Sequence, residues 1–375
     1  MAKGKIKKVF PGNNTSYGFY SFYDNIIKGK ANKVFILKGG PGVGKSSLMK
    51  KIGKVLAEKG YDVEYHCCSS DNDSLDGVAI PTLGIAVIDG TAPHVVDPKF
   101  PGAIDEIINL GEFWDKKILV EAKDNIEDYI NIISSKYKMV YSYLKEAKVA
   151  SDELEGYFKE ATDWAKVNKL IYEIINTLFR SSSPQFNRKP EVRNLFASAN
   201  TPGGYVNHLD TILQKVKKLY LLKGQQGACK EKILRSIYHF GTDRGLNCEL
   251  YHCPFDPNKI ELVCFPDIEV AFLRINEPLE FEATSVVGLE IYQEFNCDEF
   301  VYTDIIKKYK REIKDCKKRI SHLRELAWSR LKSAKESHDD LEKKYIKAMD
   351  FAAVNKRGEE ILAKILVIAD MLPVE

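Results

Sequence analysis

The residues best suited to chemistry in this chain form a glycine-rich stretch near its N-terminus. The stretch reads Gly39-Gly40-Pro41-Gly42-Val43-Gly44-Lys45-Ser46 and is followed by Ser47. Glycines at this spacing let successive backbone N–H groups curl around an anion, and a lysine and a hydroxyl follow them. We expect Lys45 to reach the β- and γ-phosphates of a nucleoside triphosphate, and the Ser46 hydroxyl to hold Mg²⁺. Residues 39–47 are therefore the predicted nucleotide-binding segment.

The sequence around this stretch supplies the context that a phosphate loop needs. The apolar run at 34–37 predicts a strand before it, and the periodic segment 47–59 predicts a helix after it. A helix that begins at the loop adds its positive N-terminal end to the site. The alternative is a glycine-rich turn that carries a lysine by chance.

A second apolar run, residues 85–88, ends in Asp89. This is the Walker B arrangement, in which a strand-end carboxylate holds Mg²⁺ directly or through water. The alternative is an aspartate that caps the following turn. His94 lies shortly after and could contact the γ-phosphate or act as a base, although a polar loop histidine is the default. The candidate catalytic residues are Lys45, Asp89 and His94, and the candidate metal ligands are Ser46 and Asp89.

The chain contains the same pattern twice. Tyr65-His66-Cys67 recurs as Tyr251-His252-Cys253, Lys45 recurs as Lys230, and Val167-Asn168-Lys169 recurs as Val354-Asn355-Lys356. The offset stays between 185 and 187 residues along the whole chain. We interpret this as a tandem duplication.

The order of apolar and periodic segments predicts an α/β fold. We expect two P-loop-like, three-layer domains with parallel sheets, each followed by a long helical, coiled-coil-like arm. The first repeat would be residues 1–180, with an αβ core at 1–103 and an arm at 104–180; residues 181–192 read as a linker. The second would be 193–375, with a core at 193–285 and an arm at 286–375. If residues 306–348 form one helix, it spans roughly 65 Å.

The two repeats differ in the residues that matter for phosphate chemistry. In the second loop Cys229 replaces Gly44 and Glu231 replaces Ser46, and Arg274 stands where the first repeat has Asp89. A carboxylate beside phosphates at ~4 Å costs on the order of 1–4 kcal/mol. The second repeat is therefore predicted to be a pseudo-site. We expect it to pack on its twin about a pseudo-two-fold axis, with Lys230 and Arg274 able to face the first site.

Two further groups of polar residues have structural explanations. The acids of segment 69–76 could orient water or a phosphate acceptor, but they also suit Asx turns. His66 and its cysteine neighbours lack the spacing of a zinc site and are better explained as strand packing.

Composition limits the other classes of function. The 56 Lys and Arg residues nearly balance the 53 Asp and Glu residues, so charge gives no strong sign of nucleic-acid binding. We find no apolar run near the ~20 residues of a membrane span, and the N-terminus lacks the apolar region of a secretory signal. Eight cysteines in such a chain predict reduced thiols and a cytoplasmic location.

The glycine loop, together with residues 69–77 and 89–94, resembles a largely uncharacterised bacterial family of tandem P-loop ATPases. The similarity covers nearly the whole chain. It implies the P-loop NTPase fold, ATP or GTP with Mg²⁺, and a cytoplasmic location, but it names no substrate.

We expect an NTPase whose turnover rearranges the helical arms or a bound protein. The arms would pack on each other or on their cores, or they would grip a protein partner. The first alternative is a small-molecule kinase, which the lack of arginine in residues 90–112 disfavours. The second is a nucleotide-gated scaffold with little turnover.

Overall fold

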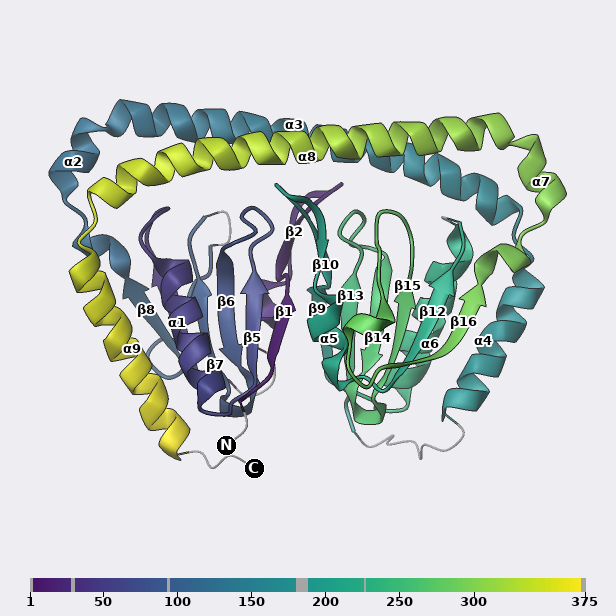
Figure 1. The fold of residues 1–375 in the computed structure, drawn as a ribbon, viewed down its shortest axis with the longest axis horizontal. Coiled ribbons are helices and arrows are strands. Elements are labelled where there is room, and N and C mark those ends of the chain that lie inside the picture. Colours follow the sequence, from purple (N-terminus) through teal and green to yellow (C-terminus); the bar gives the residue numbers. More distant parts are fainter. Residues whose placement is uncertain (1–2, 28–30, 93–94, 180–187, 226, 372–375) are drawn as a thin grey trace.

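The computed structural model describes residues 3–27, 31–92, 95–179, 188–225 and 227–371. The predicted linker at 181–192 falls largely outside these residues, as does His94. Within the described chain, two similar αβ halves stand side by side beneath a pair of long helices (Figure 1).

Each half is built on a six-stranded sheet. The first has the order β1-β5-β6-β7-β4-β8, and the second has the equivalent order β9-β13-β14-β15-β12-β16. The strands of the first sheet are β1 (Ile6–Val9), β4 (Lys33–Lys38), β5 (Val63–Cys67), β6 (Leu75–Ile80), β7 (Ile85–Asp89) and β8 (Asp105–Asn109). Those of the second are β9 (Val192–Phe196), β12 (Lys218–Lys223), β13 (Cys248–His252), β14 (Ile260–Phe265), β15 (Val270–Arg274) and β16 (Glu290–Asn296).

The sheets are largely parallel but mixed, which corrects the prediction of parallel sheets. β6 runs antiparallel to both β5 and β7, and β14 does the same in the second half. The reason is the length of the connections. Residues 68–74 and 81–84 join β6 to its neighbours, and such short segments cannot form the crossover that parallel strands require.

One face of each sheet is covered by helices. In the first half, α1 (Lys45–Glu58) and α9 (Phe351–Met371) bury their apolar residues against the strands; in the second, α6 (Ala228–Asp243) and α4 (Trp164–Phe179) do so. On the other face, the described residues include only short elements, such as the 3₁₀ turn Tyr23–Asn25 and α5 (Leu209–Ile212). The predicted three layers are therefore incomplete in the described residues; the connection 275–289 between β15 and β16, for example, contains only the 3₁₀ turn Ala283–Ser285.

The terminal helices of the arms are exchanged between the halves. α9 follows the second repeat in sequence, yet Val354, Ile361 and Ile365 lie in the core of the first half. Similarly, α4 follows the first repeat, but Val167 and Ile171 lie in the core of the second. Segments 1–180 and 193–375 are thus not self-contained domains, which corrects the predicted division.

Each αβ core extends further along the chain than the predicted boundaries at residues 103 and 285. Residues 104–180 and 286–375 were assigned to the arms, but β8 and β16 lie in these segments and pair in parallel with β4 and β12. Their strand character was hard to predict because β16 is largely exposed and β8 alternates irregularly. Each core therefore extends through its sixth strand.

The exchange is made possible by two long helices that span both halves. α3 (Lys123–Glu160) and α8 (Lys310–Lys347) lie side by side above the sheets, each preceded by a short helix, α2 (Lys116–Glu121) or α7 (Thr303–Lys308) (Figure 1). Val140 clusters with Leu331 and Phe158 with Ile313, so the pair is antiparallel. The expected single helix 306–348 is interrupted at Tyr309, and α8 spans about 57 Å.

The halves contact one another through equivalent residues, which confirms the predicted pseudo-two-fold packing. The N–H of Phe10 donates to the carbonyl of Phe196 at 2.9 Å, and the N–H of Phe196 donates back at 3.0 Å. The side-chain amide of Asn14 donates to the carbonyl of Asn200 at 3.1 Å, and the reverse bond is 2.9 Å. The two asparagines lie in the hairpins β2 (Gly12–Thr15)–β3 (Gly18–Ser21) and β10 (Ser198–Thr201)–β11 (Gly204–Asn207), whereas Phe10 follows β1 and Phe196 ends β9.

Candidate functional site

The glycine loop connects β4 to α1 at the carboxyl end of the first sheet. Gly42 and Gly44 have φ of +71° and +88°, in the left-handed region that favours glycine. The first helical hydrogen bond runs from the N–H of Leu48 to the carbonyl of Gly44 at 3.0 Å. The glycines therefore allow the chain to turn sharply from the strand into the helix.

The turn leaves several backbone donors unused. In the described part of the chain, the N–H groups of Gly42, Gly44 and Lys45 have no hydrogen-bond acceptor. Unused donors at the start of a helix make a site for an anion, because the N–H groups and the helix dipole both favour negative charge. The loop thus has the donors that phosphate recognition requires.

Lys45 turns inward toward this loop. Its Nζ donates to the carbonyls of Gly39 at 2.7 Å and Gly40 at 2.9 Å, and it lies 3.4 Å from Oδ2 of Asp89. Burial lowers the pKa of Lys45, and the negative charges of Asp89 and Glu342 oppose that effect. The ammonium is therefore held by carbonyl oxygens and a carboxylate that an incoming phosphate could replace.

Ser46 and Asp89 are the two predicted metal ligands. The hydroxyl oxygen of Ser46 accepts a hydrogen bond from the N–H of Leu75 at 3.0 Å. Oδ1 of Asp89 accepts from the N–H and hydroxyl of Thr91 at 2.9 and 2.5 Å, so Asp89 also caps its turn. Because Oδ2 of Asp89 faces Lys45, the capping role and a role at the loop are compatible. Both side chains offer oxygen, the ligand that Mg²⁺ prefers, so the donor set fits this ion.

The loop is covered by the other repeat's arm. A Cβ added to Gly42 would lie 3.0 Å from Cγ1 of Ile346 and 3.1 Å from the carbonyl of Glu342, both from α8. One added to Gly40 would lie 3.3 Å from the ring of Tyr345. The site is therefore assembled from both repeats, with the core from the first and the cover from the second.

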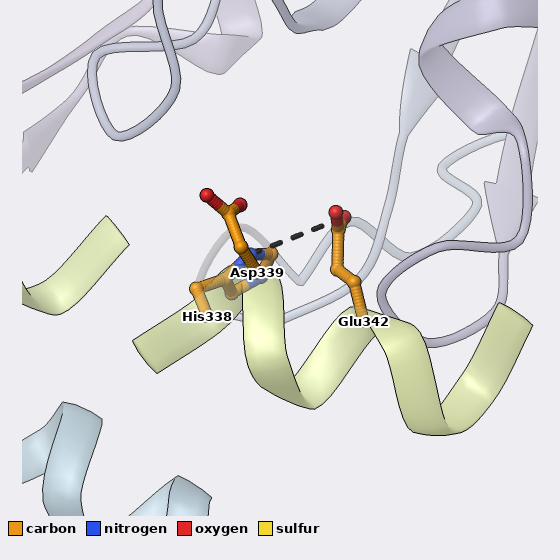
Figure 2. A group of neighbouring side chains, drawn as sticks. All are labelled: His338, Asp339 and Glu342. Carbon is orange, nitrogen blue, oxygen red and sulfur yellow. Dashed lines mark ion pairs between the residues drawn. The ribbon is translucent and has the colours of Figure 1, made fainter. Parts of the chain in front are cut away.

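Three side chains of α8 with metal-ligand chemistry lie close to this cover: His338, Asp339 and Glu342. One ligand atom from each lies within 4.8 Å of the others, and Nδ1 of His338 lies 3.9 Å from Oε1 of Glu342 (Figure 2). Asp339 is also paired with Lys335, which lies 3.3 Å from Asp71 of the first core. These groups could hold a divalent cation or act on the bound phosphates.

The sequence analysis did not identify Glu342, although a signal was present. The offset of 187 residues that relates Val167 to Val354 also relates Glu155 to Glu342. Extending the comparison of the repeats into the arms would have identified this retained acid. Its position over the first loop could not be predicted, because it depends on the exchange of the arms.

The second loop is arranged differently. The carboxylate of Asp298 accepts a hydrogen bond from the N–H of Gln225 at 2.8 Å, so the chain's own acid occupies a donor of this loop. The equivalent position in the first repeat is Gly111, since Asn109 and Asn296 correspond. A Cβ at Gly224 would lie 2.9 Å from the Asp298 carboxylate. The loop thus carries an internal anion that repels phosphate.

The predicted cations of the second repeat remain within that repeat. Nζ of Lys230 donates to the carbonyls of Gly224 at 2.6 Å and Ile275 at 3.1 Å, and burial lowers the pKa of Lys230 to about 8. Arg274 lies 3.5 Å from Glu231. The hypothesis that these residues face the first loop is wrong, because the arms, rather than the loops, cross between the halves.

Comparison with known proteins adds no relative. No protein-family model, curated protein or solved structure matches this chain. In the described residues, no helix is both long enough and apolar enough to cross a membrane. All eight cysteines are described and all are free thiols.

Proposed function

We propose that the first repeat binds one nucleoside triphosphate, ATP or GTP, together with Mg²⁺ and hydrolyses it. The observation that carries the proposal is the combination of unused N–H donors at Gly42 and Gly44 with the Lys45 ammonium, all at the start of α1. In the second repeat, Asp298 occupies the N–H of Gln225, and Glu231 stands where the first repeat has Ser46.

Each residue has a defined part in this proposal. The loop N–H groups and the α1 N-terminus receive the phosphate oxygens, and Lys45 exchanges its carbonyl partners for the β- and γ-phosphates. Ser46 and Asp89 hold the ion directly or through water. Bound Mg²⁺ neutralises charge on the phosphates.

Hydrolysis also needs a group that orients water. Glu342 is suited to this, because its backbone borders Gly42 and its negative charge acts on Lys45, opposing the burial that lowers the pKa of Lys45. In the proposed step the water oxygen bonds to the γ-phosphorus as the bond to the β–γ bridging oxygen breaks. The proton of the water passes to Glu342, and the nucleoside diphosphate leaves. The arm of the second repeat would then sense the state of the nucleotide.

Substitution of Lys45 tests the proposal. Lys45→Ala should weaken binding of Mg·ATP and Mg·GTP about 100-fold, because a charge-assisted contact worth roughly 3 kcal/mol is lost. Titration calorimetry measures the binding, and phosphate release measures turnover. The matched control is Lys54→Ala, an exposed lysine on the same helix.

Unchanged binding and turnover in Lys45→Ala would contradict the proposal. Phosphate release without an added acceptor supports hydrolysis, whereas release that appears only with a hydroxylated small molecule identifies a kinase. Tight binding with no release under either condition identifies a nucleotide-gated scaffold.

A further inference from the structure

The second repeat contains a cavity at the position of its altered loop. Its volume is about 550 Å³, within the ~300–1,000 Å³ range of small-molecule sites. The wall includes Gly227 and Glu231 beside the loop, Arg274 at the end of β15, Glu155 on α3 and Arg324 on α8. The cavity therefore occupies the place that a nucleotide would take in a working P-loop repeat.

Two arginines of the wall are poorly paired. Arg274 is 6% exposed, and in the described part of the chain its guanidinium reaches Glu231, with Nη1 donating to Oε2 at a long 3.5 Å. Arg324 donates from Nη1 to the carbonyl of Glu277 at 3.2 Å, and its guanidinium lies 4.7 Å from the ring centre of Phe255. In the described part of the chain Arg324 has no ion pair. Most of the guanidinium donors are therefore available to a ligand.

The acids of the wall, by contrast, already have partners. Glu231 also accepts from Arg235 at 2.6 Å and from the N–H of Ile260 at 2.9 Å. Glu155 is paired with Lys259. Glu261 accepts from Ser198 at 2.5 Å and from Tyr205 at 2.8 Å. Asp256 is paired with Lys148 and Lys259. These four carboxylates of the wall are therefore neutralised or hydrogen-bonded, whereas the two guanidinium groups keep spare donors.

The positive charge of Arg324 is destabilised by burial in this position. Burial lowers the pKa of Arg324, so its ionised form lacks full compensation. Guanidinium groups pair bidentately with carboxylates and phosphates, and in the described residues neither Arg274 nor Arg324 makes such a bidentate pair. An anion between Arg274 and Arg324 would satisfy both.

We propose that the cavity of the second repeat binds a small molecule through an oxyanion, either a carboxylate or a phosphate group, held by Arg274 and Arg324. A magnesium–triphosphate complex does not suit this site, because Asp298 occupies the loop N–H of Gln225 and Glu231 replaces the metal-binding hydroxyl. The second repeat has thus exchanged nucleotide chemistry for another ligand. This inference does not depend on the function proposed for the first repeat.

The test uses the full chain with Lys45→Ala, so that the first loop does not compete for phosphate. Titration calorimetry with inorganic phosphate and, separately, with succinate distinguishes the two sources of the oxyanion. We expect at least one probe to bind, and Arg324→Gln to weaken it roughly tenfold through loss of a charge-assisted contact. Arg274→Gln should have the same effect. Arg311→Gln, an exposed arginine also on α8, is the matched control and should leave binding unchanged.

Thermal unfolding identifies any variant that fails to fold. If Arg274→Gln does not fold, the binding measured with Arg324→Gln decides the test, because Arg324 lies on the long helix α8. The proposal is overturned if neither probe binds at concentrations up to about 10 mM. It is equally overturned if binding survives in folded Arg324→Gln, because the oxyanion must then lie elsewhere.

Discussion

Lys45 and Glu342 belong to different repeats and border the same glycine loop. Lys45 begins α1, and Glu342 approaches from α8, with its carbonyl 3.1 Å from the position of a Cβ on Gly42. The carboxylate acts on the pKa of Lys45, so the two charges are electrostatically coupled. We propose that residues of the first repeat bind the phosphates and that Glu342 of the second orients the water.

Glu342→Gln should separate these two roles. The amide keeps the size of the side chain but cannot accept a proton, so turnover should fall about 10²–10⁴-fold while Mg·ATP binding stays within a few-fold of the parent. Phosphate release and calorimetry measure the two quantities. Glu336→Gln, at an exposed position on α8, is the control. Parent-like turnover in Glu342→Gln would remove Glu342 from the mechanism.

At the scale of elements, the stability of each core depends on a helix exchanged from the other repeat. α9 buries Ile361 and Ile365 against the first sheet, although the sequence places this helix at the end of the second repeat. The first core therefore depends on a segment more than 300 residues from its P-loop, since Lys45 and Val354 are 309 positions apart. A fragment ending at residue 180 would expose this apolar face.

Substitutions in α9 test this dependence. Ile365 is fully buried, so Ile365→Ala should lower the free energy of unfolding by about 2–5 kcal/mol. Val367→Ala changes a side chain that is 53% exposed on the same helix and should have little effect. Urea unfolding measures both variants. Equal stabilities would mean that α9 does not pack on the first core.

Some elements were predictable from sequence and others were not. The strand before the loop, α1, β7 and the duplication follow from apolar runs, glycine spacing and repeated residues, which are local signals. The antiparallel β6, the exchange of α4 and α9, and Glu342 above the loop depend on how distant segments meet. For example, the amphipathic pattern of α9 predicts a buried face but does not identify the core that covers it. The role of Asp298 likewise could not be predicted, because it depends on the hydrogen bond that its carboxylate accepts from the N–H of Gln225.

At the scale of the whole molecule, the two halves are joined by a charge network that links the edge strands β1 and β9 with their neighbours β5 and β13. Arg193 donates to Glu64 at 2.5 and 2.9 Å, and Lys7 lies 2.5 Å from Glu249 and 3.4 Å from Glu64. Lys7 lies opposite Glu64 in the β1–β5 register, and Arg193 lies opposite Glu249 in the β9–β13 register, so the two pairs occupy equivalent places in the two sheets. The network therefore follows the pseudo-two-fold axis and fixes how the halves face each other.

This network predicts a loss of stability in acid. Burial alone would raise the pKa of Glu64, but Arg193 and Lys7 lower it well below its usual range. A carboxyl whose pKa is depressed by folding stabilises the protein above its unfolded pKa, and that stabilisation is lost as pH falls toward the folded value. The unfolding free energy should therefore decrease below about pH 4.5. Glu64→Gln should flatten this part of the profile, which urea unfolding at several pH values would measure; an unchanged slope would contradict the assignment.

The most direct test of the account is the stoichiometry of Mg·ATP binding to the full chain by titration calorimetry. The first loop offers unused N–H donors, whereas the second is blocked by Asp298, so the account predicts one site per chain. Lys45→Ala should weaken binding at this site about 100-fold. Two sites per chain would contradict the distinction between the repeats, and no binding of either ATP or GTP would contradict the proposed function itself.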